Sequence, residues 1–155
     1  MIAVLLLAAA PEAHANDLRG RFGLGFPAGL GTVSAISARY ALPTKSEAVN
    51  VQLEADGGFA AGSSVDPELV AGGRLIYGVV AEDNLSLYAA GGAHYVASGT
   101  TDIVRVQPAL GAEFFFFGLE NLGFGVEWGL NLDFGETTGI RTVSGAPAVT
   151  VHYWF

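Results

Sequence analysis

Apolar and polar side chains alternate along most of this chain with a period of two residues, which is the period of a β-strand with one apolar face. Eight segments show the alternation, and turn-forming segments rich in Gly, Pro, Asn, Asp and Ser separate them. They are residues 19–26, 32–42, 49–59, 68–80, 85–97, 103–117, 122–134 and 148–155. The pattern therefore predicts an all-β fold of eight antiparallel strands in a single domain.

The ionisable side chains of each predicted strand fall on one face, opposite to its large apolar side chains. In 122–134, Glu127 and Asp133 alternate with Phe124, Trp128 and Leu132. An Arg exposed to lipid costs about 2 to 4 kcal/mol at the bilayer midplane, so in a membrane the apolar faces must turn outward. The inward faces then predict an ion-pair network of Arg21, Arg39, Glu54, Asp56, Arg74, Arg105, Glu113, Glu127 and Asp133.

The composition favours lipid over water as the surroundings of the apolar faces. Charged residues make up 14% of the 155 residues and hydrophobic residues 51%, whereas soluble proteins contain about 25% charged residues. A soluble barrel of the lipocalin type needs a charged outer surface that this chain does not supply. No apolar run reaches the roughly 20 residues of a membrane helix. We therefore expect an eight-stranded antiparallel up-and-down transmembrane β-barrel with an apolar exterior and a polar interior.

Charge and cysteine content exclude several functions. The formal net charge of −8 argues against nucleic acid, which requires clustered Lys and Arg. Without Cys there is no disulfide framework, thiolate metal site or thiol nucleophile. The acidic pairs Asp66 with Glu68 and Glu82 with Asp83 lack the spacing of a calcium loop. We expect no metal and no other cofactor.

The two ends of the chain carry different signals. Residues 2–10 are apolar, Pro11 breaks the run, and Ala13, His14 and Ala15 form the small-x-small pattern of a signal-peptidase site. This predicts a signal peptide at 1–15 and a barrel domain at 16–155. At the other end an apolar face runs to the last residue through Val149, Val151, Tyr153 and Phe155.

This terminal pattern resembles the assembly signal of bacterial outer-membrane barrels. The alternation, the strand number and the terminal aromatic strand together resemble the small eight-stranded outer-membrane proteins of the A and X type. The resemblance implies a monomer in the bacterial outer membrane that contacts outer-membrane lipid and lipopolysaccharide and is recognised by the barrel-assembly machinery. Residues 43–48, 81–84 and 118–121 are then inner turns. The outer loops are 27–31, 60–67, 98–102 and 135–147.

Two features fit the alternation poorly. Pro108 lies inside a predicted strand, where it removes a donor from the ladder and predicts a β-bulge. Four consecutive aromatic residues, Phe114, Phe115, Phe116 and Phe117, interrupt the alternation near an inner turn. We expect these rings to plug the periplasmic mouth.

The predicted interior decides between functions. Side chains nearly fill an eight-stranded barrel, which favours a plugged interior and a structural or surface-interaction role. A porin-like passage for ions or small solutes is the alternative. A lateral channel for hydrophobic solutes would open the wall near Gly72, Gly78, Gly91, Gly92 and Pro108.

An enzyme acting on lipid A is the least favoured function. His94 and Ser98 share a face, with Asp102 in the loop beyond them. Along one strand, however, four residues span about 13 Å, far beyond a hydrogen bond. We therefore expect no enzymatic activity. The outer loops instead offer weak contacts, with Ile140 and Arg141 as the most conspicuous anchors.

Overall fold

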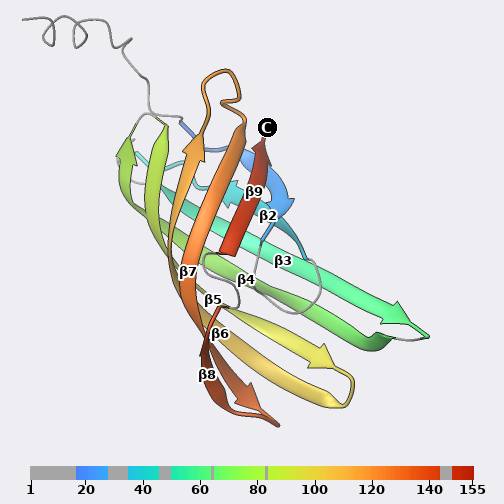
Figure 1. Cartoon of the computed structure of the whole chain (residues 1–155). Coiled ribbons are helices and arrows are strands. Elements are labelled where there is room, and N and C mark those ends of the chain that lie inside the picture. The colour runs from blue at the N-terminus through green and yellow to red at the C-terminus, as the bar shows by residue number, and fades with distance from the viewer. Residues whose placement is uncertain (1–16, 28–34, 46–49, 64, 83, 144–147) are drawn as a thin grey trace, which may run out of the picture.

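A computed structural model describes residues 17–27, 35–45, 50–63, 65–82, 84–143 and 148–155 (Figure 1). The predicted signal peptide lies outside these residues. The described strands are β1 (Phe22–Phe26), β2 (Ile36–Ala41), β3 (Val51–Gly62), β4 (Val65–Glu82), β5 (Leu85–Ser98), β6 (Thr101–Phe115), β7 (Leu122–Gly135), β8 (Gly139–Thr142) and β9 (Ala148–Trp154). No helix among the described residues is long and apolar enough to cross a membrane.

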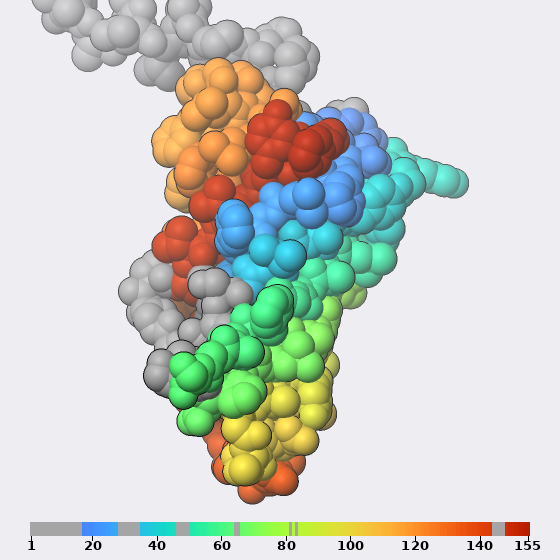
Figure 2. Space-filling view, turned by 90° about the vertical axis from the view of Figure 1, so that its right-hand side faces the viewer, coloured from blue at the N-terminus to red at the C-terminus, as the bar shows by residue number. Residues whose placement is uncertain are grey.

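The strands close into an antiparallel barrel. Consecutive strands pair from β1 to β7, and β1 also pairs with β9. β9 pairs with β7 over residues 122–127 and β8 pairs with β7 over residues 130–133. Together β8 and β9 occupy one position in the wall, so the barrel has eight strands, as the alternation predicts. Figure 2 shows the blue β1 beside the red β9 on one face of the molecule.

The hairpins that extend away from the carboxyl terminus are longer than predicted (Figure 1). β3 and β4 continue through most of the expected loop at 60–67, and β5 and β6 leave only a short turn after Ser98. The small and polar residues of these segments indicate loops, but ladder hydrogen bonds hold them in strands. A register shift between Ala60 and Gly62 accommodates Pro67, which has no partner in the β3 ladder.

The prediction of a loop over 135–147 is wrong for residues 139–142, which form β8. These residues form a strand against β7, from Thr142 opposite Leu130 to Gly139 opposite Asp133. All four residues are exposed. The sequence therefore shows no alternation of apolar and polar residues that would predict this strand. The last residues of that loop, 144–147, and most of the loop at 27–31 lie outside the described residues.

The predicted bulge at Pro108 is wrong. The β6–β7 register is the same on both sides of the proline, with Val106 opposite Leu132 and Ala109 opposite Gly129. The ladder lacks its pairs at residues 107 and 108 but gains no extra residue, because Pro108 removes a donor without lengthening the strand. On its other side Pro108 remains paired with Gly91 of β5.

Buried and exposed side chains alternate along the strands. In β7, Glu127 and Asn131 are buried, while the Trp128 side chain between them is 58% exposed. Buried apolar residues form three small clusters rather than one core. Much of the remaining buried space is occupied by Arg, Glu, Asp, Gln and His side chains.

Candidate functional site

The centre of the barrel holds Arg74 of β4 between two carboxylates. Its Nε and Nη2 atoms lie 2.9 and 2.6 Å from Oε2 of Glu54 on β3. Its Nη1 atom lies 2.7 Å from Oε2 of Glu127 on β7. Tyr88 of β5 donates a hydrogen bond of 2.7 Å to the other oxygen of Glu127. All four side chains are buried, so they form charge-assisted bonds in a region without bulk water.

Arg39 of β2 lies beside this group with longer contacts. Its nitrogens are 3.2 Å from Glu54, 3.6 Å from Glu113 and 3.7 Å from Glu127. Arg39, Glu54 and Arg74 face one another directly across β2, β3 and β4, and adjacent opposite charges stabilise such cross-strand pairs. We call Arg39, Arg74, Glu54, Glu113 and Glu127 the central cluster.

A second set of polar contacts lies on β6 and β7. Arg105 binds both oxygens of Asp133, at 2.7 and 3.0 Å. Arg141 of β8 reaches the same carboxylate at 3.1 Å. Gln107 donates a hydrogen bond of 3.0 Å to Asn131. These buried side chains form a second polar group besides the central cluster.

Two buried histidines complete the interior and are absent from the predicted network. His94 of β5 lies 2.9 Å from Asp56, through its Nε2 atom. Nε2 of His152 lies 2.6 Å from the Ser37 hydroxyl and 3.7 Å from Glu54. The sequence could have predicted both histidines as inward-facing, because each lies at an alternate position shared with other polar residues of its strand. In β9, for example, Thr150 and His152 lie on the same face.

Arg21 makes hydrogen bonds outside the network in which the sequence places it. Its guanidinium donates hydrogen bonds to Asn121 at 2.6 Å and to the carbonyl of Trp154 at 2.8 Å. The difference follows from chain position, because Arg21 precedes the first residue of β1 and lies at the barrel mouth. Nearby, hydrogen bonds from Arg19 lower the pKa of the Asp17 carboxyl to about 2.

The same mouth contains part of the predicted aromatic plug. Phe115 is buried against Leu18, Ala41 and Trp154. Phe116 and Phe117 are exposed instead. The alternation of buried and exposed side chains therefore continues along β6 as far as Phe115. Phe116 and Phe117 follow the end of the strand and lie on the surface.

Glycines on neighbouring strands make room for the long interior side chains. A Cβ atom at Gly72 would lie 2.6 Å from the ring of His94, and one at Gly92 would lie 2.5 Å from Cγ of Arg74. Gly25 gives the same space to His152. Backbone carbonyl oxygens would lie closer still to a Cβ atom at Gly72 or at Gly92. A larger residue at either position would therefore displace the backbone of a neighbouring strand as well as the polar side chain.

Neither histidine has the geometry of a catalytic triad. A triad needs the nucleophile on one ring nitrogen and the carboxylate on the other, whereas Ser37 and Glu54 both face Nε2 of His152. His94 bonds to Asp56, and Ser98 lies exposed at the strand end. Within the described residues, no group of three or more His, Asp or Glu is arranged to hold a metal ion.

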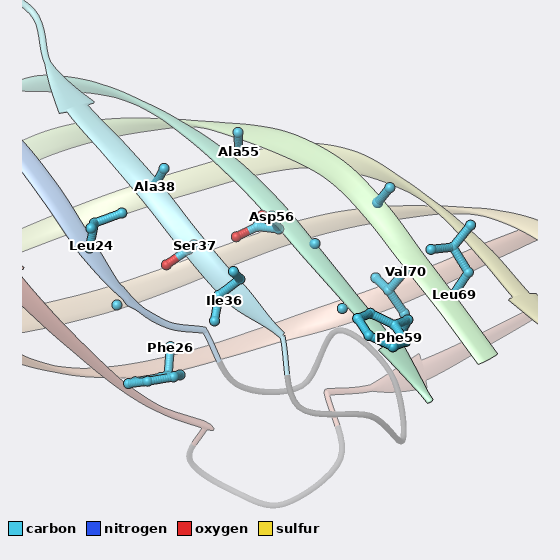
Figure 3. Close-up of a pocket in the computed structure, with 14 residues that line it drawn as sticks. Leu24, Phe26, Ile36, Ser37, Ala38, Ala55, Asp56, Phe59, Leu69 and Val70 are labelled. Carbon is cyan, nitrogen blue, oxygen red and sulfur yellow. The ribbon is translucent and has the colours of Figure 1, made fainter. Parts of the chain in front are cut away.

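A hollow of about 880 Å³ lies along β1, β2, β3 and β4 (Figure 3). Leu24, Phe26, Ile36 and Leu69 line it together with small residues such as Ala38, and the polar side chains of Ser37 and Asp56 belong to the same lining. It does not include the glycines predicted to open the wall. At Gly91 and Pro108 the β5–β6 ladder is intact, whereas the β4–β5 ladder shifts register between Gly78 and Val80 and the β6–β7 ladder lacks its pairs at residues 107 and 108.

Comparisons of this chain with family models, with curated proteins and with solved structures gave no match. Function is therefore inferred from the geometry of the barrel wall and of its interior.

Proposed function

We propose that this chain is an integral β-barrel protein of the bacterial outer membrane, with a structural or surface-interaction role and an interior plugged by ion pairs. The observation that carries the proposal is the distribution of side chains across the wall. Arg39, Arg74 and Arg105 are buried, while large apolar side chains are exposed on every one of the long strands. Water-soluble proteins distribute these residue types in the opposite way.

Exposed apolar residues supply the lipid-facing surface in this proposal. They include Leu75 on β4, Leu110 on β6 and Trp128 on β7, each more than half exposed. Soluble monomers rarely expose apolar patches larger than a few hundred square ångströms. In a bilayer the exposed apolar side chains contact lipid instead of water. The closed ladder then satisfies the hydrogen-bonding groups of the backbone. Outer-membrane lipid and lipopolysaccharide are then the constant partners of a monomer.

The interior supports a plug rather than a wide pore. Eight strands enclose a space that side chains nearly fill. Arg39 and Arg74 occupy its centre and are almost completely buried. Desolvated charges are costly unless they are paired, so the central cluster holds its own members in place. We therefore assign the cluster a structural role.

The terminal strand supports recognition by the barrel-assembly machinery. Val149, Tyr153 and Phe155 are exposed, while Thr150, His152 and Trp154 of the same segment are buried. The apolar face that resembles the assembly signal is therefore accessible from outside the barrel. In the completed barrel the backbone of β9 is paired with β1 and β7.

A passage for small ions is the second candidate function, and the geometry of Arg39 is the observation that favours it. The contacts of Arg39, at 3.2 to 3.7 Å, are longer than the bonds of Arg74. A side chain held in this way among three carboxylates can exchange partners. Movement of Arg39 would be the step that opens the passage.

Conductance of the refolded protein in planar lipid bilayers separates the plug from the passage. We expect no discrete current steps from the wild-type protein, because the central cluster fills the lumen. We expect the same silence from Glu113→Ala, since Arg39 retains Glu54 and Glu127 as partners. Discrete wild-type steps would contradict the plug, and a changed step size in Glu113→Ala would locate the passage at Arg39.

A further inference from the structure

We propose that the hollow along β1, β2, β3 and β4 binds a small apolar molecule that carries a single hydroxyl group. The proposed function gives this hollow no role. Its volume of about 880 Å³ falls within the roughly 300 to 1,000 Å³ of small-molecule sites, which are mostly apolar with a few polar groups. The lining has the same character, with apolar side chains from all four strands together with Ser37 and Asp56 (Figure 3).

Small residues on neighbouring strands form the floor of the hollow. In the ladder, Ala38 of β2 lies opposite Ala55 of β3, and Gly57 of β3 lies opposite Ala71 of β4. All four line the hollow, and they share a face because alternate residues of a strand point to the same side. The rows of residues before and after them on that face hold large side chains, namely Tyr40, Leu53 and Leu75 in one row and Phe59 and Leu69 in the other. Bulky residues thus bound the floor at both ends.

Asp56 supplies a buried hydrogen-bond acceptor. It belongs to the lining and is 6% exposed. Its Oδ2 atom lies 2.9 Å from Nε2 of His94, whereas its Oδ1 atom accepts no hydrogen bond from any described residue. Removing an acceptor from water without giving it a donor is unfavourable. A bound molecule that donates one hydrogen bond to Oδ1 relieves that cost.

The other polar side chain of the lining is already bonded. Ser37 lies opposite Asp56 in the β2–β3 ladder (Figure 3), and its hydroxyl is 2.6 Å from Nε2 of His152. Among the described side chains of the lining, Oδ1 of Asp56 is therefore the polar atom left for a ligand.

A single acceptor selects the head group of the ligand. A hydroxyl has one donor, whereas an ammonium has three, two of which would stay unpaired in an apolar hollow. An anionic head group would meet the carboxyl group of Asp56, and no Lys or Arg belongs to the described lining. The lining thus favours aliphatic or aromatic alcohols over amines, fatty acids and phosphates.

Methyl NMR of the refolded full-length chain in lipid nanodiscs, with labelled alanine, tests the proposal. The probe is 2-naphthol, whose rings shift the resonances of nearby methyl groups. We expect saturable shifts at Ala38, Ala55 and Ala71, which line the hollow. Ala93 is an exposed alanine of β5 outside the lining. It should show only the small, unsaturable change caused by 2-naphthol dissolved in the lipid.

A methyl ether, 2-methoxynaphthalene, is the matched control ligand. It has the same rings, but its oxygen cannot donate a hydrogen bond to Asp56. It should bind about tenfold more weakly, because a hydrogen bond contributes up to about this factor. The ether is less polar and enters lipid more readily, so a lower concentration near the barrel does not explain weaker binding. In Asp56→Leu the two molecules should bind equally. If that variant fails to fold, their comparison on the wild-type protein remains the test of the bond.

Gly57→Leu tests the location of the site. A Cβ atom at Gly57 would have the carbonyl oxygen of Val70, at 4.0 Å, as its nearest neighbour. A leucine therefore fits without moving the backbone, and its side chain fills the hollow. We expect the saturable shifts to disappear. Gly91→Leu is the matched control, because a Cβ atom at Gly91 of β5 meets no described atom within 4 Å and lies outside the lining. This variant should bind 2-naphthol like the wild-type protein.

Three results would overturn the proposal. The first is a set of shifts at Ala38, Ala55 and Ala71 that never saturate or that only match the change at Ala93. The second is equal affinity of 2-naphthol and its methyl ether for the wild-type protein. The third is undiminished binding of 2-naphthol by Gly57→Leu.

Discussion

Replacing Arg74 by Met should lower the free energy of unfolding by about 3 to 5 kcal/mol, the cost of removing one partner from a buried ion pair. Met preserves much of the side-chain volume, so the effect is mainly electrostatic. Glu54 and Glu127, which Arg74 contacts at 2.6 and 2.7 Å, would remain buried with Arg39 as their shared counterion. Urea unfolding of the refolded protein in lipid vesicles measures the change.

Arg141→Met is the matched control for this substitution. Arg141 also forms an ion pair, with Asp133 at 3.1 Å, but its side chain is 58% exposed. Exposed pairs contribute about 0 to 1 kcal/mol, so the control should stay within that range. Adding Glu127→Gln to Arg74→Met should recover part of the loss, because contacting residues are energetically coupled. Equal losses from Arg74→Met and Arg141→Met would show that the central cluster does not stabilise the barrel as we infer.

Replacing Leu110 by Arg should lower the free energy of unfolding in a bilayer by about 2 to 4 kcal/mol, the cost of Arg on a lipid-facing strand near the midplane. Leu110 lies near the middle of β6, opposite Ala89 and Trp128, and its side chain is 61% exposed. In a barrel surrounded by water the same surface change would stay within about 0.5 kcal/mol. Unfolding titrations in vesicles therefore separate the two environments.

Ile140→Arg provides the position control for Leu110→Arg. The Ile140 side chain is 77% exposed on β8, in the hairpin that extends away from the carboxyl terminus (Figure 1). The cost of Arg falls to about 0 to 1 kcal/mol near the membrane interface, so this variant should be nearly neutral. Small and equal effects at both positions would argue against a lipid belt around β6.

The alternation of side chains predicts the strands well where they are long. It misses β8, because four exposed residues form too short a segment to show a period. It also ends β3 too early, because the Gly, Ala and Ser residues near its end favour a turn until pairing with β4 holds them in the ladder. At Pro108 the effect of the missing donor is foreseeable, but the unchanged register depends on both neighbouring strands.

Parity groups the charged residues of each strand on one face, but it does not give their partners. Parity identifies Arg39, Glu54 and Arg74 as residues of one face, and only the register of β2, β3 and β4 brings them opposite one another. Parity also places His94 and His152 on the polar faces of β5 and β9, although neither is permanently charged. Arg21 shares the parity but lies before β1, so it bonds at the mouth.

We expect the exposed face of this barrel to meet lipid and its charged side chains to lie inside, and its two tryptophans distinguish this arrangement from the reverse one. Trp128 is 58% exposed on β7, whereas Trp154 of β9 is fully buried. In vesicles of phospholipids with brominated acyl chains, we expect strong quenching of Trp128 fluorescence in Trp154→Phe and little quenching of Trp154 in Trp128→Phe. Strong quenching of Trp154 with a protected Trp128 would contradict the claim.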